Sequence, residues 1–199
     1  MIGAAAPRVL ASQSRDELPA RLQPVTRATI ERLADSLAHE SLPVEPLYDK
    51  AAEGVLKGAD DARIVAAIRG LAQRLREARV LLGPAATDAE LAAASSALHA
   101  GAAPALIRGL VTTRDDRLPG RSLGLPLVVL ANLIADGVPA SVASESLTTL
   151  MVHGARDDEL SAFRWSVARD IQGGTTPAAA ASGVMARLLR TTGTGARQP

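Results

Sequence analysis

Apolar residues return every three or four positions along most of this chain, which is the spacing of one face of an α-helix. The pattern is clearest over 61–82, where most charged residues lie away from the apolar positions. Those apolar positions are Ile64, Ile68, Leu71, Leu75, Ala78 and Leu82. Read between Gly and Pro residues, the same period predicts nine helices. Their predicted ranges are 26–40, 44–57, 61–82, 88–100, 104–113, 125–136, 140–153, 157–172 and 177–191.

Two kinds of short sequence separate the predicted helices. In the first, a small residue ends one helix and a proline begins the next, because the first turn leaves unpaired the N–H that proline lacks. This pattern occurs at 41–43, 101–104, 137–139 and 174–177. In the second, Gly ends a helix and Asp caps the following one. It occurs as Gly58-Ala-Asp-Asp61 and Gly154-Ala-Arg-Asp157.

Short connections predict helices that fold back on one another as hairpins. The exception is a longer polar loop from Thr112 to Gly124, which would divide the chain into two halves. The predicted fold is all-α, with eight or nine short helices in stacked, solenoid-like hairpins. The predicted parts are a disordered leader or signal remnant at 1–25, an N-terminal helical half at 26–113, a linking loop at 114–124, a C-terminal helical half at 125–191 and a disordered tail at 192–199.

A shift of 96 residues aligns 37–75 with 133–171 and indicates an internal duplication. Seven aligned residues are identical, and four of them fall where a helix ends or begins. These four pairs are Pro43/Pro139, Gly58/Gly154, Ala59/Ala155 and Asp61/Asp157. Shared ancestry of a three-helix unit and independent use of the same helix-ending residues both remain open. Either way, small helical units would stack to bury a common face, as in α-solenoids.

Composition narrows the class of protein. The chain has 40 Ala and 27 Leu among 199 residues, three aromatic residues and no Cys. The absence of Cys excludes disulfides and thiolate metal sites, and the few aromatic residues argue against a β-sandwich. A formal charge of +1 argues against a protein that coats nucleic acid. No stretch reaches the ~18 apolar residues of a membrane span.

The segments Ser41–Gly58 and Leu127–Pro139 resemble uncharacterised bacterial all-helical proteins, some of which carry export signals. The resemblance covers about 37–175, its motifs are structural, and it implies no activity. Near the N-terminus, Val9-Leu10-Ala11 has the small-residue form of a signal cleavage site, but the positive and apolar regions of a complete signal are missing. A periplasmic or exported protein with a truncated signal and a cytoplasmic protein therefore both remain open.

The histidines and possible nucleophiles of the chain do not occur in the spacing of any known catalytic motif. His39, His99 and His153 each fall at the end of a predicted helix, where a polar or cationic side chain satisfies terminal carbonyls. The sequence contains neither a histidine metal-binding spacing nor a nucleophile motif. We therefore predict no catalytic residue, no metal site and no cofactor. The enzymatic alternative assembles a site from His153, Asp157 and the loop 114–121.

The best candidate surface is the arginine-rich side of the predicted helix 61–82. The predicted binding residues are Arg63, Arg69, Arg74, Arg76, Arg79 and Trp165. Against Glu77, the five arginines give about four net positive charges along ~25 Å of helix, which suits phosphate, anionic lipid or an acidic partner. The alternative is an ordinary solvated face in a chain with 20 Arg and two Lys. Trp165 is either an interface anchor or part of the core rim.

These observations predict a non-catalytic helical scaffold or interaction module, whose partner is an unknown protein. The alternative is an anion- or nucleic-acid-binding module that uses the arginine face. No transmembrane segment is predicted.

Overall fold

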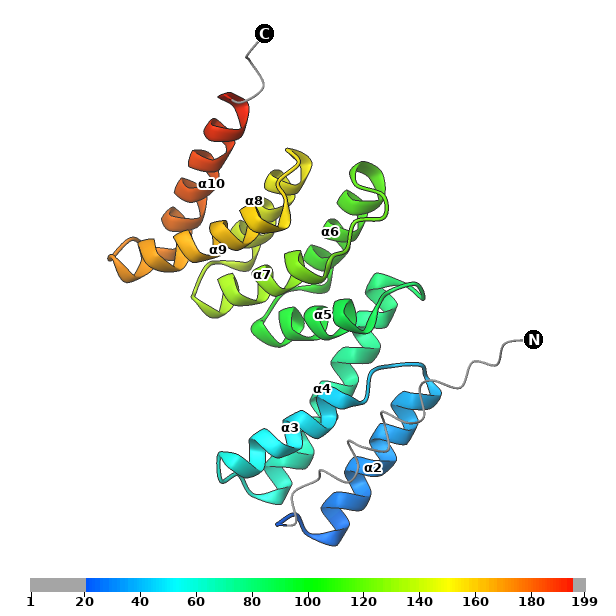
Figure 1. Cartoon of the computed structure of the whole chain (residues 1–199). Coiled ribbons are helices and arrows are strands. Elements are labelled where there is room, and N and C mark those ends of the chain that lie inside the picture. The colour runs from blue at the N-terminus through cyan, green and yellow to red at the C-terminus, as the bar shows by residue number, and fades with distance from the viewer. Residues whose placement is uncertain (1–20, 195–199) are drawn as a thin grey trace, which may run out of the picture. The chain divides into compact units, whose positions relative to one another are not determined.

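The computed structural model describes residues 21–194, and every regular element in this part of the chain is an α-helix. All nine predicted helices are confirmed, with ends that differ from the predicted ones by at most four residues. Labelled as in Figure 1, they are α2 (Pro24–His39), α3 (Glu45–Leu56), α4 (Asp61–Leu82), α5 (Asp88–Ala100), α6 (Pro104–Arg117), α7 (Gly124–Ala135), α8 (Ala140–Val152), α9 (Asp157–Gln172) and α10 (Pro177–Thr194).

The described residues form two compact units, 21–79 and 80–194. The division falls inside α4, whereas we expected it in the loop 114–124. That expectation differs from the structure because α6 continues to Arg117, and α5 and α6 pack against α7 and α8. The predicted leader 1–25 and tail 192–199 lie mostly outside the described residues, although α2 begins at Pro24 and α10 ends at Thr194.

The first unit contains α2, α3 and most of α4, which bury their apolar stripes together. Gly54 on α3 allows a close approach to α4, because a Cβ at this position would lie 2.7 Å from Cγ1 of Ile64. The buried apolar residues of this unit include Ile30, Ala34, Leu37, Leu47, Tyr48, Ala51, Ile64, Ile68, Ala72 and Leu75.

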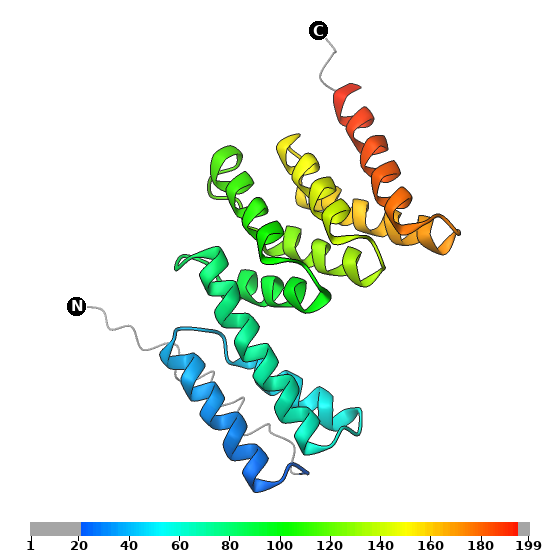
Figure 2. The same cartoon turned by 180° about the vertical axis from the view of Figure 1, so that it is seen from behind.

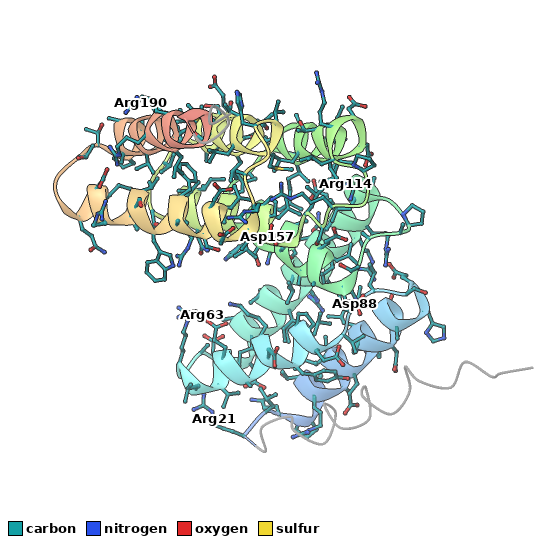
Figure 3. All side chains as sticks on the ribbon, turned by 45° about the horizontal axis from the view of Figure 1, so that its top comes forward. Arg21, Arg63, Asp88, Arg114, Asp157 and Arg190 are labelled. Atoms are coloured by element: carbon teal, nitrogen blue, oxygen red, sulfur yellow. The ribbon has the colours of Figure 1, made fainter. Side chains whose placement is uncertain are left out.

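The second unit is a stack of three helical hairpins, α5–α6, α7–α8 and α9–α10. The first helices form one layer, in which α7 contacts both α5 and α9, and the second helices form another, in which α8 contacts both α6 and α10. Both layers are visible from front and back (Figures 1 and 2) and nearly edge-on in Figure 3. The apolar run that begins at Leu123 supplies the middle of the first layer, where Leu127, Leu130 and Leu133 are fully buried.

The 96-residue repeat appears in the local geometry of both units. Three helix boundaries coincide after the shift: α2 and α7 end at 39 and 135, α3 and α8 end at 56 and 152, and α4 and α9 begin at 61 and 157. Left-handed backbone recurs too, at Ser41 and Gly137 and again at Gly58 and Gly154. Each is followed by the same 2.9 Å amide-to-carbonyl hydrogen bond that closes a helix end.

Asp61 and Asp157, which match in the repeat, each bind the segment that precedes the first helix of their unit of the repeat. Asp61 on α4 binds the segment before α2, and Asp157 on α9 binds the segment before α7. Asp61 accepts a 3.0 Å hydrogen bond from the backbone N–H of Gln23, and Asp157 accepts one of 3.1 Å from Arg121. The predicted aspartate cap is confirmed at α4, where Asp60 accepts the N–H of Arg63. At α9 the carboxylate that accepts a backbone N–H is that of Glu159, which binds Arg156, instead of the predicted Asp157.

A shorter repeat relates the three hairpins of the second unit. Left-handed glycines stand between the two helices of each hairpin, with 36 residues from Gly101 to Gly137 and 37 from Gly137 to Gly174. Equivalent hydrogen bonds close the first helix each time, from the N–H of Ala102, Val138 and Thr175. Positions on α5, α7 and α9 can therefore be compared one to one.

Candidate functional site

The arginines of α4 do not share one face of the helix. Arg63 lines a hollow beside α3, whereas Arg69 lines a hollow beside α2. At about 100° per residue, Arg63 and Arg74 lie on one flank of the buried stripe, and Arg69 and Arg76 lie on the other. The single arginine-rich face expected from the sequence is therefore split in two.

Two of these arginines bind groups within the first unit. Arg76 donates to both carboxylate oxygens of Glu40 at 2.7 Å and to the hydroxyl of Ser36 at 3.0 Å. These hydrogen bonds hold the pKa of Glu40 below its ordinary value. Arg79 donates to the carbonyl of Ser41 at 2.8 Å. Both side chains thus hold the C-terminal end of α2, and a ligand would have to displace these contacts.

Arg74 is half-buried, and its Nε has no hydrogen-bond partner among the described residues. Burial lowers the pKa of its guanidinium. Its side chain folds back over Gly70, where an added Cβ would lie 3.2 Å from Nη1. Arg74 is therefore poorly presented to a macromolecular partner.

A hollow of about 220 Å³ between α3 and α4 brings Arg63 together with two lysines that the sequence analysis did not single out. It is lined by Lys50 and Lys57, the only lysines of the chain, together with Arg63 and Glu53. Both ammonium groups bind Glu53, Lys50 at 2.7 Å, and hydrogen bonds from Lys50 and then Lys57 lower the pKa of Glu53 to about 2. The spacing 50, 53, 57 on one helix is the signal that could have revealed this group.

A larger hollow, of about 390 Å³, lies between α2 and α4. Its polar lining residues include Asp61 and Arg69, and small side chains such as Ala62 and Ala66 leave the space between the helices. Hydrogen bonds from Thr26 and from the backbone of Gln23 hold the pKa of Asp61 below its ordinary value. Because the carboxylate is already bound to α2, it is not poised to act on a ligand.

The residues of the enzymatic alternative each have a partner in the protein. His153 is exposed, and its Nδ1 donates to the carbonyl of Thr149 at 2.8 Å, as Nδ1 of His39 donates to the carbonyl of Asp35 at 2.7 Å. Asp157, labelled in Figure 3, is bound by Arg121 from the connection 118–123. The structure thus brings Arg121 to Asp157 but gives His153 a backbone partner in its own helix. Within 21–194 no group of three or more histidine, aspartate and glutamate side chains is arranged to hold a metal ion.

The first layer of the second unit presents a surface of equivalent positions, the α5–α7–α9 face. Its residues lie opposite the buried stripe of each helix and are partly or fully exposed. In matching order they are Ala89, Ala92, Ser96 and His99 on α5, Leu125, Val128, Asn132 and Ala135 on α7, and Ala162, Trp165, Arg169 and Gln172 on α9. Most of them are small or apolar.

Trp165 is the most conspicuous residue of this face. It is 65% exposed, so the interpretation of Trp165 as part of the core rim is wrong, and an interface anchor stays a prediction. The guanidinium carbon of Arg164 lies 4.1 Å from the centre of the indole ring, a cation–π geometry. Val128, at the equivalent position on α7, is 41% exposed. Sequence reasoning found Trp165 but missed Arg164, because the pairing of adjacent residues is not visible in helical periodicity.

Fold and surface together define the class: an all-α protein whose described part includes a stack of helical hairpins. No protein-family model, no curated protein and no solved structure matches the chain. Over residues 21–194, none of the helices combines the length and the apolar character needed to cross a bilayer.

Proposed function

We propose that this chain is a non-catalytic helical scaffold that binds another protein through the α5–α7–α9 face. The observation that supports the proposal is the exposure of Trp165, the only tryptophan of the chain, beside Arg164. Trp and Arg are enriched among the residues that dominate binding energy at protein interfaces. Trp165 and Val128, which occupy equivalent positions on α9 and α7, are both large apolar residues exposed to solvent. Exposed apolar surface of this kind is typical of interaction sites.

Position-specific photo-crosslinking of the full chain in its native cells tests this function. A photoreactive amino acid replaces Ala162 or Ala135 on the proposed face, and Glu145, an exposed residue of α8 in the other layer, as the control. We expect one protein to be crosslinked from Ala162 and Ala135 but not from Glu145. Adding Trp165→Ala should abolish these adducts. Equal adducts from the control position, or adducts that survive Trp165→Ala, contradict the proposal.

A second candidate function is anion binding at the hollow between α3 and α4. Lys50, Lys57 and Arg63 around Glu53 favour it. Because Asp60 lies 3.4 Å from Arg63, about one net positive charge is left at the hollow. Retention of the full chain on a phosphate resin, followed over increasing salt, tests it. Lys50→Gln with Lys57→Gln should reduce retention, whereas Arg108→Gln, a change at an exposed arginine of α6, should not. Equal effects of the two changes contradict this function.

A further inference from the structure

We propose that the α5–α7–α9 face recognises an acidic amphipathic segment of a partner protein, with the Arg164–Trp165 pair as its anchor. This inference rests on the proposed function and adds the chemistry of the partner. It starts from the charges around Trp165 and from the nature of the remaining surface.

Positive charge around Trp165 exceeds negative charge. Among residues 21–194, Arg164 forms no ion pair, and its cation lies on the indole ring. One turn further along α9, Arg169 lies 3.5 Å from Asp170. That carboxylate is also bound by Arg187 of α10 at 2.6 Å, so that two guanidinium groups share one carboxylate. The pair and this cluster together leave two positive charges without a matching negative charge.

The carboxylates next to the face stand at the ends of its helices. Asp88 and Asp158 stand at the N-terminal ends of α5 and α9, and Asp136 follows the last residue of α7. None of the twelve residues that define the face is acidic. A partner whose carboxylates reach Arg164 and Arg169 would therefore meet opposite charge, and a basic partner would meet like charge.

The rest of the face suits an apolar side of the same partner. Val128 and Leu125 on α7, which contacts α9, and Ala162 on α9 present apolar surface on the same face as Trp165. First-layer helices spaced by the usual 8–10 Å make α5 to α9 about 20 Å wide, the length of an amphipathic helix of ~14 residues. Such a helix would bind through apolar side chains on one side, and its acidic residues would lie at the edge of the interface.

The same residues fit a nucleic acid less well. Sequence-tolerant binding of single strands uses several aromatic platforms in a positively charged groove, whereas this face has one aromatic residue. Residues 80–199 contain ten Arg, no Lys and ten acidic residues, so this half of the chain carries no net charge to attract a polyanion. The face therefore favours a protein segment.

Fluorescence provides a direct test, because Trp165 is the only tryptophan and its emission reports on this face alone. The full chain is titrated with two amphipathic peptides of about 14 residues. Both have the same leucine positions, and their polar side carries Glu in one and Lys in the other. An oligothymidylate of similar length is a third probe, and sedimentation of the chain alone measures self-association.

We expect the Glu peptide to shift Trp165 emission to shorter wavelength and to bind at least tenfold more tightly than the Lys peptide. Its advantage should shrink at about 0.5 M salt, where exposed charges are screened. Arg164→Gln should weaken binding of the Glu peptide severalfold, whereas Arg108→Gln on α6 should leave it unchanged. Circular dichroism of both variants shows whether each is folded.

Four outcomes overturn the inference: no binding of the Glu peptide, equal or tighter binding of the Lys peptide, tighter binding of the oligonucleotide, or self-association that buries Trp165 without any peptide. The proposed function fails separately. If photo-crosslinks from Ala162 form and depend on Trp165 while the Lys peptide binds better, the face binds a protein and only the acidic partner is wrong.

Discussion

Replacing Glu90 should destabilise the second unit more than any exposed carboxylate does. Only 5% of Glu90 is exposed, and its carboxylate accepts hydrogen bonds from two helix starts. At α5 it accepts from the N–H and the hydroxyl of Thr87, both at 3.0 Å, and at α7 from the N–H of Leu123 at 2.8 Å and the hydroxyl of Ser122 at 3.3 Å. One side chain therefore joins neighbouring first-layer helices.

The size of the effect follows from these contacts. Losing a capping carboxylate costs about 1 kcal/mol, and leaving a buried N–H such as that of Leu123 without an acceptor costs about 1–3 kcal/mol. We therefore expect Glu90→Ala to lower the free energy of unfolding by about 3 kcal/mol. With a denaturant slope of about 1–3 kcal/mol/M, the urea midpoint should fall by roughly 1–3 M.

Urea unfolding of the full chain, followed by circular dichroism at neutral pH, measures this difference. Glu145→Ala on α8 is the matched control, because Glu145 is exposed. A shift for Glu90→Ala no larger than that for Glu145→Ala would show that the carboxylate does not hold α5 and α7 together.

The pH dependence of the same difference has a defined sign. Burial acts to raise the pKa of Glu90, but hydrogen bonds from Thr87, Leu123 and Ser122 outweigh it and hold the pKa below the ordinary 4.5. The stabilisation is therefore fully present above pH 4.5 and is lost as the pH falls through the lower pKa of the folded state. The difference in stability between wild type and Glu90→Ala should therefore narrow at acidic pH. A difference of unchanged size would refute the electrostatic reasoning.

Three further changes should alter the first unit in measurable ways. Gly54→Ala places a Cβ 2.7 Å from Ile64 Cγ1 and should cost about 1–3 kcal/mol in urea unfolding. Gly109→Ala on α6, whose Cβ would meet nothing within 4 Å, should instead stabilise by up to ~1 kcal/mol, and equal effects would contradict the close approach of α3 and α4. Tyr48→Phe removes a buried hydroxyl without a hydrogen-bond partner among the described residues and should raise the thermal midpoint, whereas a lower midpoint would reveal a partner for that hydroxyl. Arg76→Gln should cost less than ~1 kcal/mol, since Arg76 and Glu40 are both 39% exposed. Because the hydrogen bonds from Arg76 lower the pKa of Glu40, this cost should shrink as the pH falls below 4.5 and through that lowered pKa, and a cost that does not change with pH would argue against the ion pair.

Helix positions could be predicted because their causes are local. Left-handed backbone at Gly101, Gly137 and Gly174 requires residues that tolerate it, and proline at 104 and 177 suits a first helical turn. The apolar period then supplies each helix with one buried side. Where local signals were weak, the prediction failed: α6 extends through Arg114 and Arg117 because arginine is a good helix former and no glycine follows before Gly120.

The arginine surface of α4 shows where local reasoning ends. Arg63 and Arg76 look alike in the sequence, but only the packing of α2 against α4 brings Glu40 and Ser36 to Arg76. Lys50 and Lys57 belong to no motif in the sequence, and only the packing of α3 against α4 places them around one hollow with Arg63. Trp165 was ambiguous because a helical position beside a buried stripe can face either a neighbouring helix or solvent.

By itself, the sequence determined an all-α chain, nine helices with most of their ends, and a 96-residue repetition of helix-ending signals, because hydrophobic period and backbone conformation depend on residues a few positions apart. Tertiary structure alone decided which helices share a layer, where the two units divide, which charges are already paired and which face leaves Trp165 exposed. These outcomes depend on side chains that come from distant segments, such as Glu90 and Leu123, and no local pattern encodes which of them meet.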